Sequence, residues 1–233
     1  MININTQEAL FNQIGNALPK KIVVYSIGGT AMMLRGLKGE TLDIDLVFDK
    51  ESDRELFIKT LVSLGFKKDE KRVIETYGLK KNAPAMLRLE SGDFIFDLFL
   101  NKIIISVFSD GMKKRAAQTH EFGGNLVIRV ADPSDILIMK SVTGRAKDNE
   151  DIISVINNNK LNWDIILEEA KEQVKLGNEH AILGLGEKLE KLINQKIIFI
   201  PKPVTDALWN LFKEQVKNKS KKSKEKTFEK KKR

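Results

Sequence analysis

Two carboxylates on one predicted strand are the residues whose type and spacing point most directly to chemistry. Asp43 and Asp45 alternate with apolar residues over 43–48, the period-two pattern of a strand with one buried face. Both side chains therefore lie on the same face, about 6.6 Å apart at ~3.3 Å per residue. Such acids repel each other unless a cation lies between them, and Mg²⁺ accepts a few carboxylate oxygens together with phosphate oxygens and water. The alternative is a solvated strand face that carries two acids without a ligand.

A third carboxylate, Asp97, lies inside the strongly apolar segment 93–100. Burial of a lone carboxylate is costly, so Asp97 is expected to be paired, protonated or bound to metal. A metal site shared with Asp43 and Asp45 would explain its position in an apolar strand. The alternative is a salt bridge to an arginine such as Arg88.

A glycine pair, Gly28 and Gly29, ends the apolar segment 21–27 and precedes a short predicted helix over 30–35. Glycine permits positive φ and lets a ligand approach the backbone closely. The N-terminus of a helix also favours bound phosphate, because its N–H groups and its dipole present positive charge. The pair therefore predicts a phosphate-binding turn, with Thr30 as a further contact, whereas the alternative is a plain strand-to-helix turn.

A second charged cluster is predicted on two later helices. Residues 132–135 have the pattern of a helix start, with an Asp N-cap and Pro in the first turn. Lys140 borders the apolar face of that helix, and Asp148 and Asp151 lie beside the apolar stripe of the next one. These charges either contact a ligand or form a salt bridge that docks the two helices. Arg145 either binds phosphate or is solvated.

Together these features resemble the minimal nucleotidyltransferase superfamily, which has the DNA polymerase β-like fold. The resemblance rests on the glycine pair, thirteen intervening residues, the two alternating aspartates and the third acid on a later strand. It covers about residues 20–155 and looks closest to the branch that includes AbiEii-type toxins and related uncharacterised prokaryotic nucleotidyltransferases. One departure is Gly29, where Ser is more usual, so a side-chain hydroxyl contact to phosphate is lost.

The resemblance implies a Mg²⁺- or Mn²⁺-dependent enzyme that moves a nucleoside monophosphate from an NTP to an acceptor hydroxyl. The implied catalytic metal ligands are Asp43, Asp45 and Asp97. The residues expected to bind the nucleotide are Gly28, Gly29, Thr30, Lys140, Arg145 and Asp148. The acceptor could be RNA, including tRNA, a protein or a small molecule, and the activity could be of the toxin type. The alternative is a non-catalytic relative that binds nucleotide or RNA as a partner or regulatory protein.

Composition excludes several other classes of site. The chain has no cysteine, so it has no disulfide, no cysteine–zinc site and no thiol nucleophile. His120 and His180 have no ligand cluster around them in the sequence, so a Ser–His triad has little support. No apolar run reaches about 18 residues, so no membrane span is predicted. The N-terminus lacks a signal-peptide pattern, and a cytoplasmic location is expected.

The net charge of +8 is confined to one end of the chain. Residues 217–233 contain ten Lys/Arg and two Glu, whereas the remaining 216 residues contain thirty basic and thirty acidic residues. Such a segment cannot bury a core and is expected to be a disordered basic tail. It could bind RNA through phosphate contacts, or it could act only as a solubilising tail.

The order of the predicted elements indicates an α+β fold, with a nucleotidyltransferase-like mixed sheet flanked by helices and followed by a helical C-terminal part. We expect an α/β core over residues 1–130, the helical part over 131–216 and the tail over 217–233. Further predicted helices cover 5–17, 51–64, 163–175, 179–193 and 203–216. Further predicted strands cover 72–77, 86–89 and 125–130.

Overall fold

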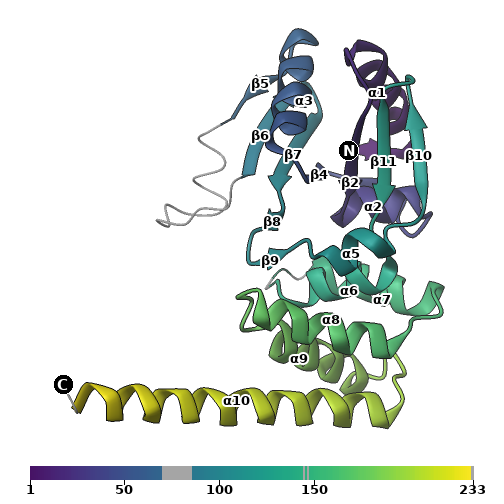
Figure 1. Ribbon diagram of the computed structural model, residues 1–233. Helices are drawn as coiled ribbons and strands as arrows, with labels where there is room; N and C mark the ends of the chain where they lie inside the picture. Colours follow the sequence, from purple (N-terminus) through teal and green to yellow (C-terminus); the bar gives the residue numbers. More distant parts are fainter. Residues whose placement is uncertain (70–85, 144, 146, 232–233) are drawn as a thin grey trace.

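The computed structural model describes residues 1–69, 86–143, 145 and 147–231, and it places a mixed β-sheet on one side of a group of helices (Figure 1). The expected α+β class is therefore confirmed. The strand predicted over 72–77 lies outside the described residues. The main path of the sheet runs in the order β10 (Thr119–Phe122), β11 (Leu126–Val130), β2 (Ile22–Ser26), β4 (Ile44–Phe48), β7 (Phe94–Leu100), β6 (Met86–Ser91) and β5 (Lys67–Lys68).

The pairing of β4, β7 and β6 at the centre of the sheet places two acids and an arginine side by side. β4 runs antiparallel to β2 and parallel to β7, and its register places Asp45 directly beside Asp97. β6 runs antiparallel to β7 and places Arg88 on the other side of Asp97. β7 continues into a hairpin of β8 (Lys102–Ile103) and β9 (Ser106–Val107). Three side chains that are far apart in the sequence thus share one row across three strands.

Two helices predicted from the sequence, α1 (Ile4–Ala17) and α3 (Glu51–Ser63), contact each other and pack on the sheet. α1 contacts β10 and β11, and α3 contacts β4 and β7. The core beneath α3 is aromatic, because the ring centroid of Phe57 lies 5.3 Å from that of Phe48 and 5.8 Å from that of Phe96. This packing fixes β4 and β7, the strands that carry the candidate site.

The short helix α2 (Gly28–Leu34) follows β2 directly and contacts β4, as well as β3 (Glu40–Thr41). β3 pairs with β1 (Ile2–Asn3) in a separate two-stranded sheet. α2 also contacts α6 (Pro133–Ser141), so it lies between the sheet and the helical part. The predicted change from strand to helix at the glycine pair is therefore confirmed.

The helical part is organised around α6, all nine residues of which are buried. Its start is as expected, since the Asp132 carboxylate accepts a hydrogen bond from Ser134 N–H at 2.9 Å. α6 contacts α7 (Lys147–Asn158), α8 (Trp163–Lys175) and α9 (Ala181–Asn194). No helix in the described ranges is both long enough and apolar enough to span a membrane.

A buried ionic cluster ties the helical part to α5 (Asp110–Arg115), which follows the β8–β9 hairpin. Arg115 Nη2 lies 2.6 Å from Asp135 Oδ1 on α6 and 2.5 Å from Glu169 Oε2 on α8. Burial raises the pKa of Asp135 to about 7 against the lowering effect of Arg115, and the nearby Glu169 charge adds to the rise. One arginine here serves two buried carboxylates.

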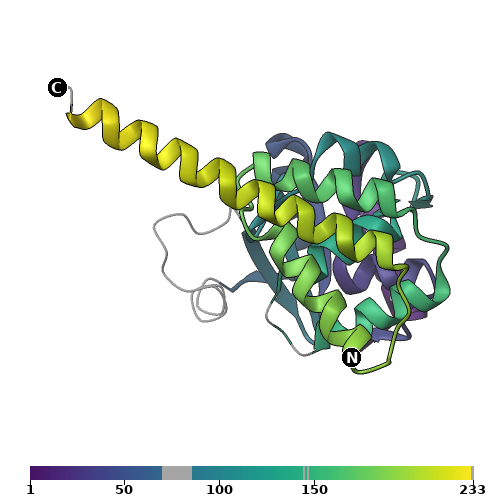
Figure 2. The same cartoon turned by 90° about the horizontal axis from the view of Figure 1, so that it is seen from below.

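The basic segment 217–233 was expected to be disordered, but α10 (Lys202–Lys231) continues into it as one helix as far as Lys231. Its first half packs on α8 and α9, and its second half projects away from the rest of the protein (Figure 2). The packed half supplies the costly helix nucleus, and Lys and Glu, which have good helix propensity, then extend it residue by residue. Lys219 also forms an ion pair with Glu179 at 2.7 Å.

Candidate active site

The three aspartates singled out by the sequence converge where the start of β4 lies beside the middle of β7. Asp43 immediately precedes β4, Asp45 lies within it, and Asp97 lies beside Asp45 on β7. Each offers a carboxylate oxygen, and these three oxygens all lie within 4.8 Å of one another. The alternation on β4 and the parallel register with β7 together create this cluster.

The electrostatics of the cluster favour a bound cation. Burial raises the pKa of Asp45 well above its usual value, and the charges of Asp43 and Asp97 raise it further. Burial also raises the pKa of Asp97, although Arg88 opposes that rise. Three carboxylates held this close are stabilised by a shared positive charge. An all-oxygen donor set of this kind fits Mg²⁺ or Mn²⁺, so the residues present suit the metal that the family resemblance implies.

Arg88 and Asp97 form a two-pronged salt bridge. Arg88 Nε donates to Asp97 Oδ1 and Arg88 Nη2 donates to Asp97 Oδ2, both at 2.6 Å. The sequence left open whether Asp97 joins a carboxylate cluster or pairs with an arginine, and it does both. A carboxylate oxygen has two lone pairs, so an oxygen that accepts from Arg88 can still coordinate a metal ion. Arg88 therefore orients Asp97 within the cluster.

Gly28 is confined by its backbone and by Asp45. Its φ of +55° lies in the left-handed region, and a Cβ atom there would lie 2.5 Å from Asp45 Oδ2. Any side chain at this position would be strained and would displace the carboxylate. Gly28 therefore lets the start of α2 approach the carboxylate cluster directly.

Gly29 and Thr30 contact other parts of the protein, Thr41 and Asp45 respectively. A Cβ atom on Gly29 would lie 2.3 Å from Thr41 Oγ1, so Thr41 fills the space in which a serine side chain would begin. Thr30 is fully buried, and its hydroxyl accepts a hydrogen bond from Asp45 N–H at 2.9 Å. Thr30, expected as a phosphate contact, instead fastens α2 to β4 and thereby positions Asp45.

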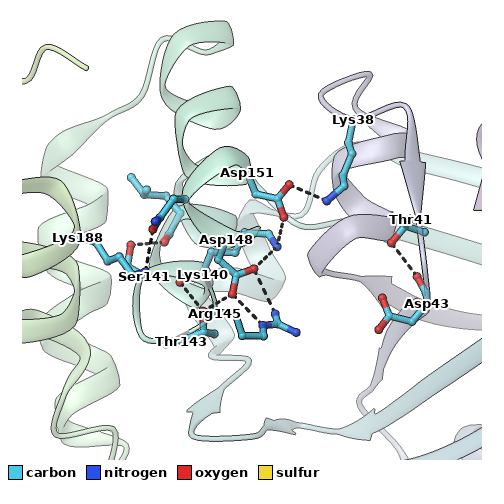
Figure 3. Close-up of polar contacts among 12 residues, drawn as sticks. Lys38, Thr41, Asp43, Lys140, Ser141, Thr143, Arg145, Asp148, Asp151 and Lys188 are labelled. Carbon is cyan, nitrogen blue, oxygen red and sulfur yellow. Dashed lines mark hydrogen bonds and ion pairs between the residues drawn. The ribbon is translucent and has the colours of Figure 1, made fainter. Parts of the chain in front are cut away.

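The charged residues predicted on α6 and α7 form one network (Figure 3). Lys140 Nζ lies 3.0 Å from Asp148 Oδ1 and 2.5 Å from Asp151 Oδ2. Lys38, in the connection between α2 and β3, lies 2.7 Å from Asp151 Oδ1. Burial acts to raise the pKa values of Asp148 and Asp151, but Lys140 together with Thr143 and Arg145 at Asp148, and with Lys38 at Asp151, lowers both. The salt bridge that docks the two helices, one of the two alternatives from the sequence, is therefore present.

Arg145 extends this network toward the carboxylate cluster. Its Nε donates to Asp148 Oδ2 at 2.9 Å, and Thr143 donates a short hydrogen bond to the same carboxylate. Arg145 is half exposed, yet its charge and that of Lys140 act to lower the pKa of Asp45. The positive side chains of the helical part thus lie within electrostatic reach of the three aspartates.

A cavity of about 330 Å³ joins the two sets of charges. The sheet half contributes the three aspartates and Gly28, and the helical part contributes Lys140, Thr143 and Arg145. The remaining lining residues are Ile27, Phe99, Ile103, Ile104, Ile105, Ser106, Met139 and Val142. Gly29, Thr30 and Asp148 are not among these lining residues. Asp148 instead forms ion pairs with the lining residues Lys140 and Arg145.

Comparison with known proteins identifies the family of the chain. Residues 6–182 match the model of a family described as "Nucleotidyltransferase of unknown function (DUF6036)". The chain belongs to this nucleotidyltransferase family. A crystal structure of a candidate nucleotidyltransferase from H. pylori is similar over 94% of this chain and 96% of that chain, with a TM-score of 0.41 and 16% sequence identity. No curated protein matches the sequence.

Two residues that contact the candidate site were not assigned from the sequence. Lys38 was overlooked because it lies in a loop and meets Asp151 only in the folded chain, 113 residues away. Thr41 was overlooked because its contact with the glycine pair depends on β3 folding back beside α2. Neither contact has a local sequence signal, since both depend on tertiary packing.

Proposed function

We propose that the chain is a metal-dependent nucleotidyltransferase that moves a nucleoside monophosphate from an NTP to an acceptor hydroxyl. The observation that carries the proposal is the convergence of Asp43, Asp45 and Asp97 in a cavity that also contains Lys140 and Arg145. One side of the cavity suits divalent cations and the other suits phosphate. A nucleoside triphosphate with its metal ions needs both kinds of surface in one place.

Each carboxylate has a distinct part in the proposed mechanism. Asp43 and Asp45 would hold the metal that accompanies the triphosphate, and all three aspartates would hold the metal at the acceptor. Bound divalent ions would supply charge neutralisation and would lower the pKa of the attacking hydroxyl. Thr30 and Arg88 act indirectly, since they fix the positions of Asp45 and Asp97.

The transfer itself exchanges one phosphorus–oxygen bond for another. The acceptor oxygen bonds to the α-phosphorus, the bond from that phosphorus to the bridging oxygen of the β-phosphate breaks, and pyrophosphate leaves with the electron pair. The proton of the acceptor hydroxyl passes to Asp97 where that carboxylate acts as base, and to solvent water where Asp97 is a metal ligand. Lys140 and Arg145 stabilise the charge of the triphosphate and of the departing pyrophosphate.

We propose RNA, including tRNA, as the acceptor class, because residues 217–233 carry the whole positive excess of the chain and α10 extends into this segment as far as Lys231. Lysines along a projecting helix contact phosphates with strong salt dependence and without reading the sequence. A toxin-type role in the cytoplasm follows if the RNA is one that the cell needs. In that case, expression of the chain should arrest growth, and Asp45→Asn should restore it.

The direct test is incubation of the full chain with labelled NTPs, Mg²⁺ or Mn²⁺ and total RNA, followed by detection of labelled product. We expect Asp45→Asn to reduce transfer by about 10³-fold or more, because metal-assisted charge stabilisation supplies several kcal/mol. Asp93→Asn is the matched control, since Asp93 is exposed four residues before Asp97 and lies outside the cavity. A chain that ends at Val216 tests the contribution of α10.

The outcomes separate the enzyme from its alternative. Transfer that survives Asp45→Asn would overturn the assignment of the site. Binding of NTP and metal without any transfer would favour a non-catalytic nucleotide- or RNA-binding relative. RNA affinity that is unchanged at low salt after truncation at Val216 would remove α10 from the acceptor site.

A further inference from the structure

The turn of the β8–β9 hairpin has a conformation that its sequence does not favour. Ile103 pairs with Ser106, so Ile104 and Ile105 alone form the turn. Ile104 has a φ of 52°, in the left-handed region that β-branched residues rarely adopt. Two-residue hairpin turns usually contain Gly, Asn or Asp for this reason. The chain therefore retains an isoleucine where glycine would be less strained.

The same turn lies in the cavity of the three aspartates. Ile104 and Ile105 both line it, and Ile105 is 43% exposed. Phe99 on β7 and Val142 at the end of α6 extend this apolar lining. The cavity thus has a charged part, suited to metal and phosphates, and an apolar part without charge. Backbone strain concentrated at a ligand site is a recognised indicator of function.

The neutral polar side chains among the described lining residues are already engaged by the protein. Ser106 Oγ accepts a hydrogen bond from Asn178 Nδ2 at 3.1 Å. Thr143 Oγ1 lies 3.0 Å from the Lys140 carbonyl oxygen and also donates to Asp148. The apolar part of the cavity therefore offers mainly contact surface, and the Ser106 hydroxyl is the neutral side chain beside it that can still donate a hydrogen bond.

We propose that the turn formed by Ile104 and Ile105 is the wall against which the nucleobase of the NTP packs. This inference rests on the proposed function and specifies how the same cavity selects its substrate. The charged part holds the triphosphate, and the base then extends along the apolar lining formed by the turn, Phe99 and Val142. Burial of a flat aromatic base against aliphatic side chains is favourable and needs no hydrogen bond to the base edge.

A wall of this kind predicts weak selection between bases of equal size. Adenine and guanine differ in the groups on their edges, which isoleucine side chains do not distinguish. We expect ATP and GTP to bind with affinities within about a hundredfold of each other, whereas a site that hydrogen-bonds its substrate rejects an analogue by about 10⁴-fold or more. Discrimination of that larger size would overturn the proposal.

The decisive experiment compares Mg-ATP with Mg-tripolyphosphate, which has the phosphates but no base, by titration calorimetry on the full chain. Ile105→Asn should weaken binding of Mg-ATP about tenfold and leave binding of Mg-tripolyphosphate unchanged. Ile197→Asn is the matched control, because Ile197 is 44% exposed and lies outside the cavity. Ile104→Asn is a second variant, since asparagine tolerates positive φ and should preserve the turn.

The results distinguish an error in the nucleobase assignment from an error in the proposed function. If both variants bind Mg-ATP like the unmodified chain, the nucleobase wall is wrong while the triphosphate site stands. If Ile105→Asn weakens Mg-ATP and Mg-tripolyphosphate equally, the effect is not on the base and the wall is again wrong. If the unmodified chain binds neither compound, the proposed function fails and the wall fails with it.

Discussion

The two sets of charges that face the cavity are built on opposite principles. On the sheet, Asp43, Asp45 and Asp97 bring like charges together, and Arg88 balances only part of them. On the helices, positive and negative side chains alternate, so that Lys140 lies between Asp148 and Asp151. The first arrangement raises pKa values and the second lowers them. A charged cluster that its own protein leaves unbalanced is therefore the better indicator of a ligand.

The difference also explains why both sets occur in one cavity. The sheet side has excess negative charge and suits cations, whereas the helical side presents Lys140 and Arg145 to the cavity and suits an anion. Neither side alone would bind a metal–nucleotide complex, which contains both signs. The salt bridges that dock α6 and α7 also fix the positions of the positive side chains that face the cavity.

The largest effect on stability is expected from Lys140→Met. The substitution leaves Asp148 and Asp151 buried without their shared cation, and removal of one partner of a buried ion pair costs about 3–5 kcal/mol. Urea unfolding measures the loss. Lys171→Met is the control, because Lys171 pairs with Glu168 on the surface of α8 and should change stability little.

A second step tests whether the network is structural. Adding Asp148→Asn and Asp151→Asn to Lys140→Met removes the two buried carboxylate charges and should restore part of the lost stability. A triple variant no more stable than Lys140→Met would contradict the assignment of a docking network. Nucleotide affinity that is unchanged in a folded Lys140→Met protein would remove Lys140 from the phosphate site.

A change in stability of the opposite sign is expected on the sheet, where Asp45→Asn should raise the free energy of unfolding of the metal-free protein. The pKa of Asp45 is raised on folding, so its ionised form destabilises the folded state above the unfolded pKa. Replacement by a neutral side chain should therefore raise the free energy of unfolding at pH 8. Thermal unfolding without and with Mn²⁺ measures both this gain and the metal-dependent stabilisation, which only the unmodified chain should show.

Asp93→Asn should leave both measurements unchanged, since Asp93 is exposed outside the cluster. A loss of stability in metal-free Asp45→Asn would mean that the aspartates are structural, like those of α7. The comparison between the two charged regions would then fail.

An effect of intermediate size is expected at the Arg115 cluster, where one cation pairs with two acids. Asp135 has a folded pKa of about 7, above its unfolded value, so the folded state loses stability as the pH rises toward 7. Between pH 5 and pH 8 this contribution is about 2 kcal/mol, and Asp135→Asn should remove it. Urea unfolding at both pH values measures the slope, and Asp110→Asn, at a 90% exposed side chain, should leave it unchanged.

The carboxylate cluster could be predicted because its signals are local. The alternation at Asp43 and Asp45 fixes their common face, and the apolar surroundings of Asp97 require a partner wherever the strand lies. The α+β class and the helix start at Asp132 follow from equally local patterns. Strand register is not local, so the sequence could name Arg88 as one alternative without showing that it would be the neighbour of Asp97.

Where the structure differs from what the sequence suggested, the difference has an identifiable physical reason. The composition of 217–233 predicts disorder, but the packed first half of α10 supplies a helix nucleus that composition does not reveal. The β8–β9 turn lacks the Gly or Asn that normally marks a hairpin, and no turn was predicted there. Thr30 was assigned to phosphate because the sequence does not show that its hydroxyl faces Asp45 N–H.

The parallel pairing of β4 with β7 has a consequence for how this site can change. The separation of Asp45 and Asp97 is set by the hydrogen-bonded ladder, in which neighbouring strands lie about 4.8 Å apart. Side-chain exchange elsewhere cannot tune that distance, because the backbone holds it. Asp43 lies just outside the ladder, so adaptation to an ion of another radius would fall on this residue and on its short connection to β3.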